Sequence, residues 1–176
     1  MEGLIPPDLL KLYFASAIDI RRSAKFPWRR LYEGYRLDGE VVDEFVGGVA
    51  NTVNHVVDGS DSGSFSGRRD RSSLAILTAW NPRGVKVSGL ENDLANRRLF
   101  DDLLKLGFSY GESLFDSLGL DTTPGSAYHE VGYAIVEDDG SASVEVTRRY
   151  GQLAVYKISD GCLSVVDCQG GLIHYC

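Results

Sequence analysis

The sequence predicts a single α/β (α+β) domain, a two-layer sandwich in which a mixed sheet of about four to five strands carries helices packed on one face. Three observations predict this class. The 176 residues are 43% hydrophobic, which is enough to bury one substantial core. The apolar run at 74–80 is typical of a central strand, because both of its faces would be buried. From residue 73 onward, strand patterns alternate with helical patterns until two consecutive strands follow near the C-terminus.

Two helices and a strand are expected ahead of this core. The proline pair at 6–7 begins a helical pattern, and the stretch 18–21 then alternates as a strand does. Valines between 40 and 57 recur at helical spacing. Residues 58–72 consist of Gly, Ser and charged residues with almost nothing to bury, and they predict a flexible surface loop. The elements before this loop are too few to fold alone, so residues 1–176 form one domain.

The helix predicted to begin after Ser88 has the clearest local signals. Ser88 and Glu91 form an S-x-x-E capping box, and Gly107 is a suitable C-terminal stop. Apolar residues expected to face the core recur along it: Leu99, Phe100, Leu103 and Leu106. Three opposite-charge pairs at i,i+4 are expected on its outer face: Asp93/Arg97, Arg98/Asp102 and Asp101/Lys105.

The rest of the core is predicted from alternation and turn residues. Residues 107–125 are rich in Gly, Asp and Thr and are expected to form a loop. Strands are predicted over 128–136, 153–158 and 162–168, the last of them ending the sheet. Asp160-Gly161 is expected to turn the final hairpin. Residues 141–150 fit a strand by local propensity, but their apolar residues also share one helical face.

Composition excludes several classes of protein. The formal net charge of −7 argues against a general nucleic-acid binder, because phosphate neutralisation needs a basic face. The basic and aromatic segment 21–30 could grip a phosphate backbone, but its arginines are more simply explained as partners of the chain's own acidic residues. No apolar run approaches the ~18 residues of a membrane span, and the first residues lack a signal-peptide pattern.

The cysteines give no sign of a metal or redox centre. Cys162, Cys168 and Cys176 follow no common zinc or redox spacing, and His174 is the single histidine near them. We therefore expect no metal and no cofactor. A sparse, odd set of cysteines fits a reducing compartment, so the expected location is the cytoplasm.

The candidate site lies where the strand at 74–80 turns into the following helix, since α/β folds place ligands at such connections. Asn81 precedes Pro82, which is expected to hold it extended, with its amide free for a local Asx turn or for a ligand. Arg83 suits a phosphate or carboxylate, but it could equally be solvated. Asn92 and Asn96 share one helical face and either join the helix to the turn or line a pocket. The predicted ligand-binding residues are Thr78, Asn81, Arg83, Asn92, Asn96 and Gln152.

Catalytic candidates are weaker. Glu91 is explained by the capping box. His129 and Glu130 begin a strand and could act as a base with its partner, but adjacent strand residues point to opposite faces. A solvated strand end is the simpler explanation for both. Gln152 either satisfies backbone groups or contributes an amide to the pocket. No nucleophile triad and no glycine-rich phosphate loop is recognisable.

Several short motifs in order resemble the DUF3293 family, a bacterial domain of unknown function. They are Thr78-Ala79-Trp80-Asn81-Pro82, Glu91-Asn92, Glu130 and Tyr150-Gly151-Gln152-Leu153-Ala154, within about residues 73–157. The resemblance implies a small α/β protein with a helix before the Gly-Gln pair, which favours a helix over 141–150. The chain departs from the family pattern in its long 38–72 region and at Gly84. No activity is implied.

Three functions remain open at this point. The first is a non-metal binding module for a small polar anionic ligand, nucleotide-like or sugar-phosphate-like. The second is an acidic protein-interaction or inhibitor protein that docks on a basic or nucleic-acid-binding partner. The third is an enzyme on a nucleotide-type substrate, with Glu130 or His129 as base. A concave pocket at the turn 78–96 would favour the first, and a contiguous acidic surface without one would favour the second.

Overall fold

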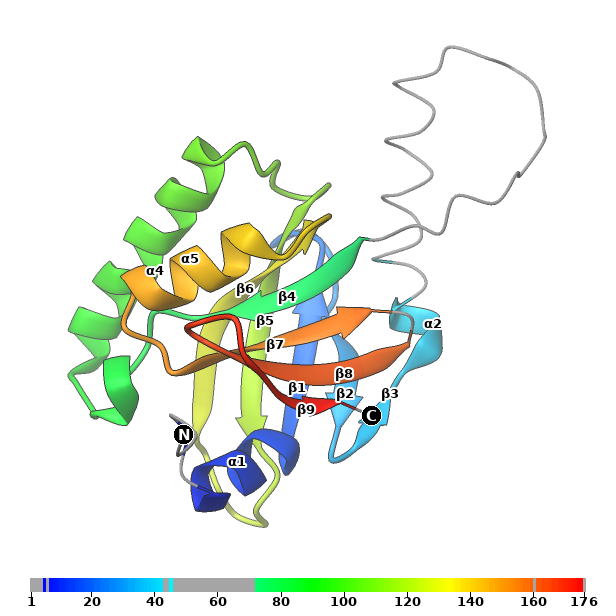
Figure 1. Cartoon of the computed structure of the whole chain (residues 1–176), viewed down its shortest axis with the longest axis vertical. Coiled ribbons are helices and arrows are strands. Elements are labelled where there is room, and N and C mark those ends of the chain that lie inside the picture. Colours follow the sequence, from blue (N-terminus) through cyan, green and yellow to red (C-terminus); the bar gives the residue numbers. More distant parts are fainter. Residues whose placement is uncertain (1–4, 6, 43–44, 46–71, 160, 176) are drawn as a thin grey trace.

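The structure is a computed structural model that describes residues 5, 7–42, 45, 72–159 and 161–175. These residues form a strongly curled antiparallel sheet of nine strands in the order β3-β2-β1-β5-β6-β4-β7-β8-β9 (Figure 1). The strands are β1 (Ser16–Arg21), β2 (Arg29–Glu33), β3 (Arg36–Leu37), β4 (Ser73–Leu77), β5 (Leu114–Asp121), β6 (His129–Glu137), β7 (Ala154–Ser159), β8 (Cys162–Asp167) and β9 (Leu172–Tyr175). The helices are α1 (Pro7–Phe14), α2 (Gly39–Val42), α4 (Gly89–Lys105) and α5 (Ser141–Arg149), with a 3₁₀ turn, η2 (Pro82–Gly84).

The predicted two-layer sandwich with a mixed sheet of four to five strands is wrong. Every pairing between named strands is antiparallel, and β2, β3, β5 and β9 were not predicted as strands. The largest omission is β5, which lies in the expected loop 107–125 and pairs with both β1 and β6. The chain also continues beyond the strand at 162–168 into β9, so that strand does not end the sheet.

Helices are not confined to one face of the sheet. One face packs against α4 and α5 through Leu99, Leu103 and Val146. The opposite face carries a second core that includes Phe14 of α1 and Val41 and Val42 of α2. The alternation along β6 explains how one sheet serves both cores: Ala134 and Val136 face one core, and Ile135 between them faces the other. Both faces of the central strands are therefore buried.

The α4 helix follows the sequence prediction closely. Ser88 accepts a hydrogen bond from the Glu91 backbone, and the Glu91 carboxylate accepts one from the Ser88 backbone, so the capping box is confirmed. Leu99 and Leu103 are fully buried as expected. The prediction for Leu106 is wrong, because it is the C-cap residue and its side chain is 43% exposed.

The ambiguous segment 141–150 forms the helix α5. The helix begins after Gly140, which has a left-handed backbone (φ 75°), and Asp139 accepts hydrogen bonds from the Ser141 backbone and hydroxyl. The Glu137 carboxylate accepts from the backbone N–H of Ser143 at 2.9 Å. These acceptors satisfy N–H groups of the first turn and stabilise the helix against the local strand propensity.

The N-terminal predictions are confirmed in part. The helix from the proline pair is α1, and the strand at 18–21 is β1. Of the helix expected over 40–57, the structure describes α2 and Phe45, and the remainder lies outside the described residues. The predicted loop 58–72 lies outside them as well, apart from Ser72.

Candidate functional site

The predicted asparagines join α4 to the turn that follows β4. The Asn96 side chain accepts from the backbone N–H of Ala79 (2.9 Å) and donates to the carbonyl of Val131 (2.7 Å). The Asn92 side chain accepts from the backbone N–H of Asn81 at 2.9 Å. Both asparagines are 4% exposed, so these contacts are shielded from water. Because helix and turn are 11 or more residues apart, the two amides fix a tertiary contact that the backbone alone does not provide.

Asn81 itself has a left-handed backbone (φ 45°, ψ 60°), so the expectation that Pro82 holds it extended is wrong. Asparagine tolerates this region better than other side chains with a Cβ. The Asn81 Oδ1 atom accepts from the Val87 backbone and from Asn92 Nδ2, both at 3.2 Å. Its amide nitrogen lies 3.4 Å from the hydroxyl of Tyr128. These contacts stabilise the unusual turn.

Thr78 and Gln152 also bond within the protein. The Thr78 hydroxyl donates to the Val131 carbonyl and accepts from the Trp80 backbone, each at 3.0 Å. Gln152 donates to the Trp80 carbonyl at 2.7 Å. Thr78, Asn81, Asn96 and Gln152 therefore use their polar atoms to hold one short turn in place.

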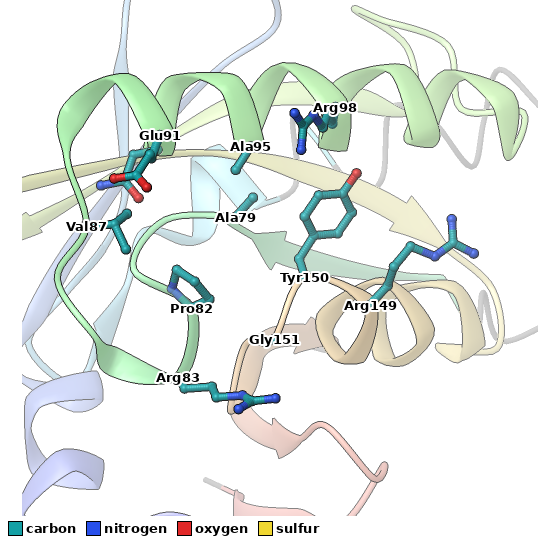
Figure 2. A pocket seen from close by; sticks show the side chains of 11 residues that line it. Ala79, Pro82, Arg83, Val87, Glu91, Ala95, Arg98, Arg149, Tyr150 and Gly151 are labelled. Atoms are coloured by element: carbon teal, nitrogen blue, oxygen red, sulfur yellow. The ribbon is translucent and has the colours of Figure 1, made fainter.

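A pocket of about 620 Å³ lies between η2, the N-terminal half of α4 and the C-terminal end of α5 (Figure 2). Its apolar wall consists of Ala79, Pro82, Val87 and Ala95. Its polar wall includes Arg83, Glu91, Asn92, Arg98, Arg149 and Tyr150. Figure 2 shows the three arginines arranged around Tyr150 and Gly151. Of the predicted ligand-binding residues, Arg83 and Asn92 line this pocket.

The charges on the pocket wall are mostly positive. Neither Arg83 nor Arg98 has an ion pair with any residue that the structure describes. Arg149 lies 3.4 Å from Asp102 and 2.6 Å from Glu145. The one carboxylate on the wall, Glu91, accepts from the Ser88 hydroxyl and backbone, and these hydrogen bonds lower its pKa. The wall therefore carries three guanidinium groups and one carboxylate that remains ionised.

Tyr150 is held toward α4 by Asp102. Its hydroxyl donates to the Asp102 carboxylate at 2.9 Å. Burial, followed by this hydrogen bond, raises the pKa of Tyr150 to about 12, and the same bond lowers the pKa of Asp102. Asp102 thus pairs with Lys105, Arg149 and Tyr150. Tyr150 remains a neutral hydroxyl at physiological pH and forms a fixed part of the wall.

Arg83 sits in strained backbone beside the pocket. Its φ of 58° and ψ of 23° fall in the left-handed region, which costs a residue with a Cβ about 1 kcal/mol or more. The backbone N–H of Arg83 donates to the Gly151 carbonyl at 2.8 Å, and Gly151 also has a positive φ of 67°. These contacts fix the η2 turn against the end of α5. They place the guanidinium of Arg83 on the pocket wall.

The catalytic candidates lie outside this pocket, and His129 and Glu130 do not come together. The His129 ring packs against Trp80 with the ring centroids 5.9 Å apart. Glu130 follows the register of Ala134 and Val136, on the opposite face of the sheet from α4. Burial raises the pKa of Glu130 to about 7, and Glu130 in turn contributes, after burial, to the raised pKa of Tyr13.

Sequence reasoning missed Arg98, Arg149 and Tyr150. The sequence predicts a surface pair of Arg98 with Asp102, but Asp102 contacts Arg149, Lys105 and Tyr150 instead. A usable signal existed for Tyr150, because it begins one of the motifs that resemble the DUF3293 family. No local signal marks Arg149, since its position on the pocket wall depends on how α5 packs against α4.

The fold and site define a curled antiparallel-sheet domain with an arginine-lined pocket between η2, α4 and α5. The model of DUF3293, a protein family of unknown function, matches residues 77–155, which confirms the resemblance seen in the sequence. All of the residues that line the pocket fall inside the matched segment. No curated protein and no solved structure matches the chain significantly.

None of the helices in the described residues is long and apolar enough to cross a membrane. Within the same residues, no three His, Cys, Asp or Glu side chains are grouped so that they could hold a metal ion.

Proposed function

We propose that the protein is a binding module for a small polar anionic ligand, nucleotide-like or sugar-phosphate-like, which occupies the pocket between η2, α4 and Tyr150. The observation that carries the proposal is the cluster of three arginines on the pocket wall, two of which have no carboxylate partner in the described part of the chain. Guanidinium groups bind phosphates and carboxylates through paired N–H donors. Unpaired guanidinium groups on a concave wall favour an anion.

The size and the apolar wall support a small organic ligand over a free ion. A volume of about 620 Å³ falls in the range of small-molecule sites, roughly 300–1,000 Å³. The apolar side chains of Ala79, Pro82 and Val87 offer a surface for the non-ionic part of a ligand. A nucleoside or sugar carrying a phosphate has both of the required parts.

The charge distribution gives the ligand an orientation. The ionised Glu91 stands at the end of the pocket nearest the start of α4, where it would repel an anion. Arg98 and Arg149 stand toward Tyr150 at the other end (Figure 2). We therefore expect the anionic group near Tyr150 and the uncharged part near Val87. We infer that Thr78, Asn81, Asn96 and Gln152 support the turn and that Arg83 faces the ligand. Asn92 lines the pocket, but its amide is already bonded to Asn81.

The enzyme alternative gains no support from the geometry. Glu130 lies on the other face of the sheet from the pocket, and His129 is not part of the pocket wall. The acidic interaction alternative rests on the net charge of −7 alone. Binding therefore remains the proposed function.

The proposal is tested by a thermal-shift screen of matched pairs. Each nucleoside monophosphate or sugar phosphate is compared with the same compound without its phosphate, and inorganic phosphate is measured alone. We expect at least one phosphate-bearing compound to raise Tm, its uncharged counterpart to have little effect, and the shift to weaken as salt is added. Equal shifts from charged and uncharged members, or no shift across the screen, would contradict an anion-binding pocket.

A further inference from the structure

The solvent face of α4 carries a short apolar and charged stripe. Its members are Leu90, Leu94, Arg97, Asp101 and Leu104, spaced by four, three, four and three residues. All five are exposed, and the leucines are 70%, 42% and 42% exposed, respectively. The buried residues of α4, Asn92, Asn96, Leu99 and Leu103, lie on the opposite side of the helix. Figure 1 shows α4 at the edge of the molecule, with the sheet and α5 on its inner side.

The spacing of this stripe is that of a coiled-coil seam. Alternating steps of three and four residues average 3.5, which keeps a stripe facing one partner helix along its length. All five side chains then occupy core positions of the seam. Arg97 and Asp101 lie in its two central layers, and Leu94 and Leu104 lie on either side of them. Within the described residues neither Arg97 nor Asp101 forms an ion pair, although pairs with Asp93 and Lys105 were expected. Both charges therefore remain available to a partner.

We propose that α4 binds the α4 helix of a second copy of this chain in an antiparallel arrangement, so that the protein forms a two-fold symmetric dimer. The central part of the stripe is symmetric about the level of residue 99. In an antiparallel pair Leu94 meets Leu104 of the second copy, and Arg97 meets Asp101 of the second copy. The two-fold axis generates each contact twice.

Charge complementarity favours the antiparallel pair over a parallel pair in register. A parallel pair in register would place Arg97 against Arg97 and Asp101 against Asp101, and like charges in contact oppose association. The antiparallel pair converts both repulsions into attractions and buries four leucines that are partly exposed in the monomer. The contact is short, about 15 Å from Leu94 to Leu104 along the helix, so we expect a dimer that dissociates on dilution.

Sedimentation equilibrium over a range of protein concentrations tests the proposal with charge-reversed variants. For the wild type we expect an average mass that rises from one chain toward two. Arg97→Asp and Asp101→Arg each place like charges together and should weaken the dimer at least about tenfold. Lys86→Asp changes the net charge as Arg97→Asp does, lies exposed outside the stripe, and should leave the dimer unchanged.

The decisive sample is an equimolar mixture of the two single variants. One chain then presents two aspartates and the other presents two arginines, so the mixed pair is complementary at both contacts and should associate where each variant alone does not. The double variant R97D/D101R should dimerise with itself for the same reason.

Circular dichroism is used to check that each variant is folded. A wild type that stays monomeric at millimolar concentration, or a mixture that associates no better than its components, would overturn the proposal. Neither result depends on ligand binding in the pocket.

Discussion

Asn81 and Asn92 bond to each other through two separate contacts. Asn92 Oδ1 accepts from the backbone N–H of Asn81 at 2.9 Å, and Asn92 Nδ2 donates to Asn81 Oδ1 at 3.2 Å. The pair connects the left-handed turn after β4 to the first turns of α4. Because Arg83 follows this turn directly, the two asparagines also determine where its guanidinium lies on the pocket wall.

Asn92→Ala should lower the free energy of unfolding by about 1–3 kcal/mol, because it leaves the Asn81 N–H without its shielded acceptor. Urea denaturation measures the change. Asp93→Ala is the control: Asp93 is the next residue of α4, is exposed, and should change stability by no more than about 0.5 kcal/mol. If the two substitutions had equal effects, the Asn81–Asn92 contact would not be structural.

Gly132→Ala should be strongly destabilising. A Cβ atom at position 132 would lie 2.2 Å from the carbonyl oxygen of Leu77 and 3.1 Å from Ser117 Oγ, so β4 and β6 would have to separate. We expect a loss of about 3 kcal/mol or more. The matched control is Gly119→Ala on the neighbouring strand β5, where the nearest atoms would be 3.7 Å away. Tm values for the two variants make the comparison, and similar values would contradict the close approach of β4 and β6.

Glu130 should make stability depend on pH. Its pKa is raised from 4.5 to about 7 by burial, so between these values the folded state keeps a proton that the unfolded state releases. Stability therefore falls as pH rises from 4.5 to 7 and is unaffected by this group outside that window. The loss is at most about 3 kcal/mol, reduced by the part of the side chain that remains in contact with water.

Denaturation of wild type and Glu130→Gln from pH 4.5 to 8 isolates this contribution. The variant should lack the component of the decrease that Glu130 causes and should be the more stable of the two at pH 8. Glu112→Gln, at an exposed position, should follow the wild-type curve. Parallel curves for wild type and Glu130→Gln would show that Glu130 titrates normally.

The helices and strands that the sequence predicts correctly are those that contacts between nearby residues determine. The capping box of α4 lies within four residues, and the leucines that pack against the sheet recur at helical spacing. By contrast, β5 contains Asp116, Ser117 and Gly119, which individually disfavour a strand. Its pairing with β1 and β6 outweighs these preferences. Of these partners, β1 lies more than 90 positions away in the sequence, so a local pattern cannot reveal the pairing.

The candidate site, like the fold, could be predicted only where local sequence determines it. The position of the turn and the pairing of Asn92 with Asn81 could be anticipated from spacing and side-chain chemistry. The left-handed backbone of Asn81 could not, since a following proline ordinarily disfavours it. The cluster of Arg83, Arg98 and Arg149 depends on the packing of α5 against the η2 turn, which brings residues more than 60 positions apart onto one wall.

Binding of an anionic ligand in the arginine-lined pocket is tested by calorimetric titration. The best phosphate-bearing compound is titrated into wild type, Arg98→Gln and Lys86→Gln. Arg98 lines the pocket, whereas Lys86 is exposed nearby, is not part of the wall, and loses the same charge. Arg98→Gln loses one charge-assisted contact, worth about 1.5–3 kcal/mol, so its affinity for the ligand should be at least about tenfold weaker than that of the wild type. The affinity of Lys86→Gln should stay close to the wild-type value. Equal affinities for all three proteins would contradict anion binding in this pocket.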